Sequence, residues 1–267
     1  MKFHIKAATI LLLTLVFALN CSSINAKDGD TKVIREKSFN IAAGKKIILN
    51  TSSGDIKITP WDKAEVYIKV LGNKRAEEKF TFSFNSTSEE VTIEAERRGG
   101  WNLFSNINLE FEIKVPYNFN IYANTSGGDI KVAGVKGDIK LKTSGGDIWG
   151  DRFEGNFYAK TSGGNINLFC SNAKIEASTS GGDIELEYTG LNQGIELRTS
   201  GGDIDIKLPA DFNAKADLKT SGGDVDCNLT LNEVIKLSDT KIIANINQGG
   251  KPLIASTSGG DISVLQK

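Results

Sequence analysis

Histidine, proline and long hydrophobic runs are scarce in this chain of 267 residues, and each scarcity narrows the possibilities. The single histidine is His4, so the remaining sequence offers no imidazole to activate a nucleophile, bind zinc or transfer protons near neutral pH. Only four prolines occur beside 28 glycines and many isoleucines, valines and threonines, which favours strands and turns over helices. The net charge is −1 and there is no basic stripe, so we expect no nucleic-acid partner.

One repeated phrase, Thr-Ser-Gly-Gly-Asp-Ile, organises the sequence. Full copies lie at Thr125–Ile130, Thr143–Ile148, Thr179–Ile184, Thr199–Ile204 and Thr257–Ile262, and close variants at Thr51–Ile56, Thr161–Ile166 and Thr220–Val225. The threonines from Thr125 to Thr220 are spaced by 18, 18, 18, 20 and 21 residues, which indicates stacked repeats. On this basis the 37 residues from Thr220 to Thr257 correspond to two coils with one eroded motif, and the 74 residues from Thr51 to Thr125 to about four coils.

A finer period lies inside the repeat. Apolar residues such as Ile139, Phe157 and Ile175 stand nine residues before a motif isoleucine, so each unit contains two short strands separated by turns. One unit cannot bury its apolar residues alone, but stacked units can. The sequence therefore predicts an all-β fold, a single-chain β-solenoid (β-helix) of about 18-residue coils. Longer alternating runs before residue 120 predict longer, partly antiparallel strands that cap its N-terminal end.

The motif has a structural interpretation at each position. We expect the two glycines to supply positive-φ freedom for a tight turn, and the aspartate to bind backbone N–H groups just beyond it. Stacking should place threonine on threonine and serine on serine, as hydroxyl ladders. The repeat-turn residues are Asp55, Asp129, Asp147, Asn165, Asp183, Asp203, Asp224 and Asp261.

The N-terminus has the form of a secretory signal. Lys2 and Lys6 precede an apolar run at 7–19 that is too short to span a membrane. Cleavage after Asn20 would make Cys21 the first mature residue of a lipoprotein, because Ala18–Cys21 resembles a bacterial lipobox; ordinary cleavage after Ala26 is the alternative. We therefore divide the chain into a signal peptide (1–20), a flexible tether (21–32), an N-terminal strand region and cap (33–120) and the repeat solenoid (121–267).

A loop at 97–104 interrupts the strand pattern of the N-terminal region. It contains Arg97, Arg98, Trp101 and Phe104. One interpretation is a hairpin loop whose aromatic side chains fold onto the neighbouring sheet. The other is an exposed contact loop in which the aromatics meet a partner or a membrane beside the two arginines.

The two cysteines beyond the signal region are expected to be free, buried thiols. Cys227 takes the place held by Leu168 and Leu186 in other repeats, and Cys170 lies two residues after Leu168. They are 57 residues apart, which is about three coils or roughly 14 Å, too far for a disulfide.

Carboxylates are the one possible catalytic resource, but a repeated column gives them near-equivalent environments. Glycosidase chemistry needs two carboxyls whose pKa values are pushed apart, so we expect no enzyme and no cofactor. Calcium binding by the motif turns is the alternative to turns without a metal, since Gly-Gly-Asp followed by an apolar residue is similar to a calcium-binding nonapeptide repeat. The third glycine of that repeat is missing, and Asn165 interrupts the aspartates.

The repeated phrase, the strand end Lys114-Val115-Pro116 and the segment 249–253 before the last motif together resemble a known bacterial family. It is the putative-adhesin family of β-strand-repeat domains of unknown function, and the likeness covers about residues 35–265. The resemblance implies an exported, β-helical, adhesin-like protein and brings no catalytic or ligand-binding residues with it.

The sequence thus favours an exported cell-envelope lipoprotein whose solenoid serves binding or structural presentation without catalysis. Its expected partners are the membrane, through the lipid anchor, and an unidentified protein or glycan. Its expected location is the outer membrane or cell surface, or otherwise the periplasm. A periplasmic structural or signalling module and a calcium-stiffened β-roll are the alternatives.

Overall fold

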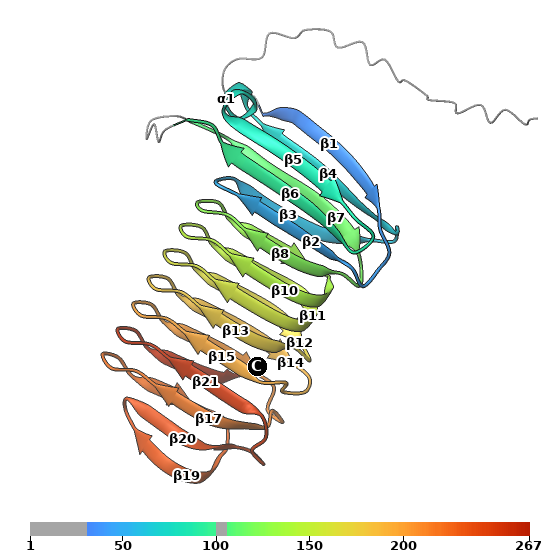
Figure 1. The fold of residues 1–267 in the computed structure, drawn as a ribbon. Helices are drawn as coiled ribbons and strands as arrows, with labels where there is room; N and C mark the ends of the chain where they lie inside the picture. The colour runs from blue at the N-terminus through green and yellow to red at the C-terminus, as the bar shows by residue number, and fades with distance from the viewer. Residues whose placement is uncertain (1–30, 100–105) are drawn as a thin grey trace, which may run out of the picture.

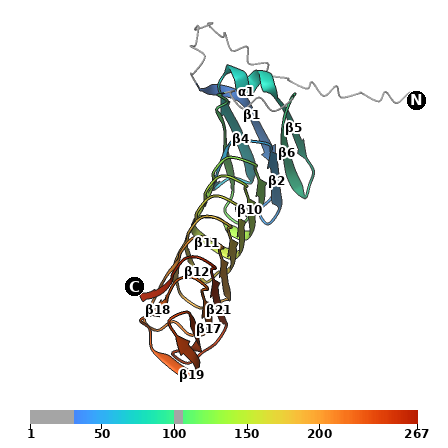
Figure 2. The same cartoon turned by 90° about the vertical axis from the view of Figure 1, so that its left-hand side faces the viewer.

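The structure is a computed structural model and describes residues 31–99 and 106–267. Two long sheets face each other across a narrow core, and the coils stack into an elongated, curved body (Figures 1 and 2). We call the sheet whose strands lead into the motif turns the upstream sheet, and the sheet whose strands leave those turns the downstream sheet. The strand β11 (Ile148–Lys160) starts in the downstream sheet and ends in the upstream sheet. The predicted β-solenoid fold is confirmed.

The remaining strands divide cleanly between the two sheets. In spatial order from the N-terminal end, the upstream sheet contains β5 (Phe80–Ser86), β6 (Glu90–Arg97), β2 (Lys46–Thr51), β8 (Asn120–Asn124), β10 (Lys136–Lys142), the end of β11, β13 (Lys174–Ser178), β15 (Ile195–Arg198), β21 (Pro252–Ser256), β17 (Ala214–Lys219), β20 (Lys241–Ile246) and β19 (Leu231–Ser238). The downstream sheet contains β1 (Lys32–Asn40), β4 (Glu65–Gly72), β7 (Leu109–Pro116), β3 (Asp55–Trp61), β9 (Ile130–Ala133), the start of β11, β12 (Ile166–Ser171), β14 (Ile184–Thr189), β16 (Ile204–Leu208), β22 (Ile262–Gln266) and β18 (Val225–Cys227).

The core is a set of columns in which equivalent residues of successive coils lie on one another. Ile148 pairs with Ile166 and Ile166 with Ile184, and all are buried. Burying one such side chain stabilises the fold by about 1.5–3 kcal/mol. Each coil contributes only one strand to each sheet, so its side chains are fully buried only when neighbouring coils stack on it. The 18-residue period is thus the length of one turn around this core.

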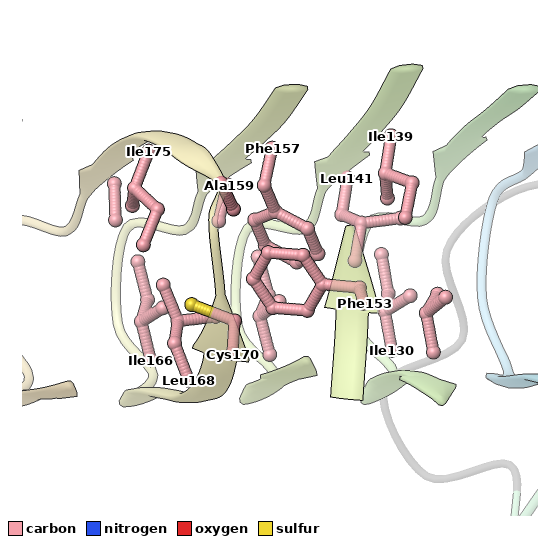
Figure 3. Close-up of a cluster of buried hydrophobic side chains, with 14 of the residues drawn as sticks. Ile130, Ile139, Leu141, Phe153, Phe157, Ala159, Ile166, Leu168, Cys170 and Ile175 are labelled. Carbon is pink, nitrogen blue, oxygen red and sulfur yellow. The ribbon is translucent and has the colours of Figure 1, made fainter. Parts of the chain in front are cut away.

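One coil fills the core with aromatic rings. Phe157 takes the place held by Ile139 in the coil before, and its ring stacks on that of Phe153 with centroids 4.1 Å apart (Figure 3). Gly150 stands where Leu168 lies in the next coil. A Cβ on Gly150 would lie 2.7 Å from Phe153 and 2.8 Å from Phe157, so the missing side chain makes room for the rings.

The last coil in the sequence is not the last in the stack. β21 pairs with β15 on one side and β17 on the other, and β22 likewise lies between β16 and β18, as the strand order in Figure 1 shows for the upstream sheet. The segment before it forms the antiparallel hairpin β19–β20, which covers the end of the upstream sheet. The prediction of two coils between Thr220 and Thr257 is therefore wrong. The chain leaves the stack, forms the hairpin and returns to an inner position.

The N-terminal end has a similar arrangement. β2 lies between β6 and β8, and β3 lies between β7 and β9, so the Thr51 coil stacks directly on the Thr125 coil. The prediction of about four coils between them is also wrong. The intervening residues form β4 to β7 and the short helix α1 (Lys74–Lys79), which is capped by Asn73. β4 runs antiparallel between β1 and β7, and β5 runs antiparallel to β6, which gives the long antiparallel strands expected at this end.

The two cysteines are free but differ in burial. Cys170 is buried, and this burial raises the pKa of its thiol to about 12. Cys227 lies in the column of Leu168, as expected, but it is partly exposed because β18 is an edge strand. The inserted strand β22 places four strand steps between the cysteines, about 19 Å, in place of the three expected. Within residues 31–99 and 106–267, no helix has the length and apolar character to cross a membrane.

Candidate functional site

The motif threonine holds each coil to the coil before it. The Thr161 hydroxyl donates to the carbonyl oxygen of Gly146 at 2.9 Å and accepts the N–H of Gly164 at 3.3 Å. Thr143, Thr179, Thr199, Thr220 and Thr257 repeat both contacts. Each of these side chains is buried, so an unmet hydroxyl would be costly. The expected threonine-on-threonine ladder is therefore wrong, because the hydroxyl bonds to neighbouring backbone instead.

The motif aspartates also bond between coils. Asp129 Oδ1 accepts the backbone N–H of Asp147 at 2.9 Å, and Asp147 Oδ1 accepts that of Asn165 at 2.7 Å. Asn165 Oδ1 accepts the next N–H, from Asp183, at 2.8 Å. The same bond joins Asp55 to Asp129, Asp183 to Asp203, Asp203 to Asp261 and Asp261 to Asp224. Asparagine is tolerated in this column because the bond needs a side-chain oxygen, not a charge. The expected bond to N–H groups within the same turn is wrong.

The second motif glycine is required for close approach. A Cβ on Gly146 would lie 2.1 Å from the carbonyl oxygen of Gly128, and one on Gly164 would lie 2.0 Å from that of Gly146. Neither glycine has a positive φ, so the expected role in a left-handed turn is wrong for them. The early variant differs, since Gly54 has φ of 110°. A side chain at the second position would push two coils apart.

The turn column supports structure better than chemistry. Its carboxylates share one hydrogen-bond pattern, so their environments do not separate into an acid and a base. Next to the column, burial first and then the charges of Asp203 and Glu185 raise the pKa of Asp205. Among the described residues no group of three or more histidine, cysteine, aspartate or glutamate side chains is placed to hold a metal ion.

The candidate contact loop is described only at its start. Arg98 Nε donates to the Thr81 hydroxyl at 2.6 Å, and its backbone N–H donates to the Lys79 carbonyl, so the loop leaves from the β5–β6 hairpin. The backbone N–H of Arg97 donates to the Ser52 hydroxyl at 3.1 Å. Trp101 and Phe104 lie outside the described residues, as does Cys21. The two interpretations of this loop therefore both stay open.

The outer face of the upstream sheet contains a groove of about 290 Å³ across β8, β10, β11 and β13. Tyr122, Lys140 and Tyr158 follow one another across three adjacent strands, on the face opposite the buried Ile139. The ammonium groups of Lys140 and Lys142 lie 5.3 Å and 5.8 Å from the ring centre of Tyr158. This groove was not predicted from the sequence. The signal was present in the same 18-residue spacing, applied to the outward positions.

A family profile decides the classification, since it matches residues 44–167 and again residues 156–265. The chain belongs to the Toastrack DUF4097 family. The two Toastrack matches overlap within β11 and β12 and together cover nearly all the stacked coils. The expectation of an adhesin-like family of unknown function is supported at this level, whereas the Thr-Ser-Gly-Gly-Asp-Ile phrase as a mark of the family stays a prediction.

Solved structures resemble this Toastrack chain at low identity. A "putative cell adhesion protein" from Clostridium sporogenes is 15% identical, with a TM-score of 0.38, covering 87% of this chain and 99% of that one. A "putative adhesin" from Bacteroides fragilis is 11% identical, with a TM-score of 0.43 and coverage of 89% and 98%. A "putative lipid binding protein" from Parabacteroides distasonis is 14% identical, with a TM-score of 0.39 and coverage of 89% and 98%. Comparison with curated proteins finds no match.

Proposed function

We propose that this protein is an exported cell-envelope protein whose solenoid serves as a rigid, non-catalytic binding surface. The observation that supports this most directly is the outer face, where equivalent positions recur at each coil in exact register over many strands. A ligand with its own repeat can contact several such positions at once, and their sum gives avidity without a deep pocket. The continuous core and the hydrogen bonds between the turns of neighbouring coils keep these positions fixed relative to one another.

Binding accounts for the residues better than catalysis does. The carboxylates that recur most regularly are those of the turn column, and all of them except Asp224 accept a backbone N–H from a neighbouring coil. Hydrolytic chemistry needs carboxyl groups with contrasting pKa values, and equivalent partners work against such a contrast. A measured glycosidase or esterase activity that depends on one of these aspartates would contradict this part of the proposal.

The proposed attachment to the membrane is a lipid on Cys21, followed by the tether to residue 32. Metabolic labelling with a palmitate analogue should mark the wild-type protein and not Cys21→Ala. Loss of labelling together with release from the membrane fraction supports the anchor. Equal labelling of both proteins, or an N-terminus beginning after Ala26, contradicts it.

Protease treatment of intact cells, with lysed cells as the control, tests the location. Cleavage of the solenoid on intact cells supports display at the surface. Protection until lysis contradicts surface display and favours the alternative of a periplasmic structural or signalling module.

The calcium alternative has its own test. One oxygen of each motif aspartate except Asp224 already accepts a backbone N–H, which leaves fewer oxygens for a cation that needs six to eight. We expect the thermal midpoint to be the same in calcium and in EDTA. A large upward shift with calcium would support the calcium-stiffened roll instead.

A further inference from the structure

The groove on the upstream sheet combines two ring faces with a row of polar groups. Tyr122 and Tyr158 lie two strand steps apart, about 9.6 Å, with Lys140 on the strand between them. Along one side run Asp138 and Asn156, whose amide donates to the Asp138 carboxylate at 2.7 Å. The site is therefore a shallow track along the solenoid axis, not an enclosed pocket.

The lysines of this track are not neutralised by the protein. Within the described residues no ion pair is formed by Lys140, Lys142 or Lys174. Lys160, which pairs with Lys142 on the neighbouring strand, forms none either. Other lysines of the same sheet are paired, since Lys46 on β2 pairs with Glu90 at 2.8 Å and Lys136 at the start of β10 pairs with Glu154 at 3.0 Å. The groove itself is lined by two lysines, Lys140 and Lys174, and two carboxylates, Asp138 and Glu176. Lys142 and Lys160 add two more unpaired ammonium groups at the next outward position of β10 and β11. The track favours a ligand with negative charge.

We propose that this track binds an acidic polysaccharide, a chain of uronate-bearing pyranose rings that lies along the solenoid axis. The apolar faces of two sugar rings pack on Tyr122 and Tyr158, whose hydroxyls stay free for polar contact. The sugar carboxylates lie near Lys140, Lys142 and Lys174. Asp138 and Glu176 accept hydrogen bonds from sugar hydroxyls, and the Asn156 amide both accepts and donates them.

A polyphosphate chain fits less well than a glycan. Nucleic acid binds by releasing counterions along a continuous basic surface, and here the two carboxylates interrupt the track in a protein of net charge −1. A plain polyanion also has no use for the tyrosine faces. The combination of rings, lysines and hydroxyl-binding groups is what selects a charged sugar.

Calorimetry with the purified mature chain tests this proposal, using hexasaccharides of alginate and of hyaluronan as probes. We expect binding of at least one of them, weakened by added salt because charged contacts are screened. Neutral cellohexaose and polyglutamate of similar length should bind at least about tenfold more weakly, since each lacks one of the two recognised features. No binding of either hexasaccharide overturns the proposal. Equal binding of polyglutamate, or tighter binding of a single-stranded oligonucleotide, overturns it as well.

Variants separate the track from the rest of the surface. Tyr158→Ala and the double variant Lys140→Gln/Lys142→Gln should each lower affinity about tenfold, while Tyr158→Phe keeps most of it. Trp149→Ala is the matched control, because Lys131 lies 4.2 Å from that ring on the opposite sheet in the same kind of contact. Thermal melts show whether each variant is folded. Equal losses for Trp149→Ala and Tyr158→Ala contradict the assignment to this track.

The inference rests on the proposed binding function but can fail separately from it. A folded, surface-displayed protein that binds neither hexasaccharide loses the ligand assignment and keeps the binding role. A protein that binds in solution but is protected on intact cells loses the surface role and keeps the ligand class.

Discussion

The two glycines of one motif, only one residue apart, should differ sharply when each is replaced by alanine. A Cβ on Gly163 would lie 3.7 Å from the nearest atom, the Ser144 carbonyl oxygen, which is ordinary contact. A Cβ on Gly164 would lie 2.0 Å from the Gly146 carbonyl oxygen. Neither glycine has a positive φ, so the comparison isolates close approach from backbone preference.

The magnitude follows from what must move. To reach ordinary contact, the coils at Gly164 must separate by about 1.4 Å. That movement lengthens the Thr161 hydroxyl bond to Gly146, now 2.9 Å, and the bond from the Asn165 N–H to its acceptor, now 2.7 Å. Overpacking costs about 1–3 kcal/mol, and a buried group left unsatisfied costs about 1–3 kcal/mol more. We therefore expect Gly164→Ala to lower the free energy of unfolding by about 2–6 kcal/mol.

Urea unfolding followed by circular dichroism measures the difference. Gly163→Ala should change the free energy of unfolding by less than about 1 kcal/mol, with a gain as possible as a loss because alanine restricts the unfolded chain. Comparable m-values would show that both variants unfold the same amount of structure. If the two variants differ by less than about 1 kcal/mol, the close-approach account of the motif is refuted.

Substitutions at three further positions test the hydrogen bonds between motif aspartates, a buried phenol and the core. Asp147→Asn should change the free energy of unfolding by less than about 0.5 kcal/mol, because Asn165 already accepts the equivalent hydrogen bond. Asp147→Ala should lower it by about 1 kcal/mol, because the hydrogen bond to the Asn165 N–H is lost. Equal urea midpoints for the two variants would contradict the proposed role of these bonds. Burial raises the pKa of Tyr188 from 10.0 to about 12. Between pH 10 and 12 the folded state therefore keeps a proton that the unfolded state loses. The free energy of unfolding present below pH 10 should fall by roughly 2–3 kcal/mol over that range. Urea titrations across that range should show a shallower fall for Tyr188→Phe, and an unchanged slope would show that this phenol is not responsible. Gly150→Ala should lower the free energy of unfolding by about 1–3 kcal/mol through overpacking against Phe157, and a thermal midpoint equal to wild type would contradict that packing.

The sequence was sufficient to predict the strands and the solenoid because the period of 18 is imposed by the core. Inward positions such as Ile148, Ile166 and Ile184 must be apolar at every coil, so the pattern is regular and easily recognised. The turn residues were located for the same reason. Their bonding was mispredicted because short-range turn rules assume partners within one turn. These coils are close enough for Thr161 to bond to the coil before it and for Asp147 to bond to the coil after it.

The order of the coils could not be predicted from spacing. A gap of 37 residues fits two coils as well as it fits a hairpin and a return, since length along the chain does not specify which edge a strand joins. The outward groove was missed for a different reason. Surface positions tolerate many residues, so Tyr122, Lys140 and Tyr158 stand out only when the inward period is applied to the other face.

The inner position of β21–β22 has a consequence for how the chain folds. Synthesis runs from the N-terminus, so β17 and β18 exist before the strands that will separate them from β15 and β16. The turn sequences at Thr199 and Thr220 are near-identical. The Thr220 coil can therefore stack directly on the Thr199 coil, in an incorrect strand order, before β21 and β22 are made. The final strand pair must then displace that contact, a long-range step that is slow because its partners are distant in sequence. Completion of the stack therefore waits for β21 and β22, and we expect a chain truncated before residue 252 to keep the incorrect register.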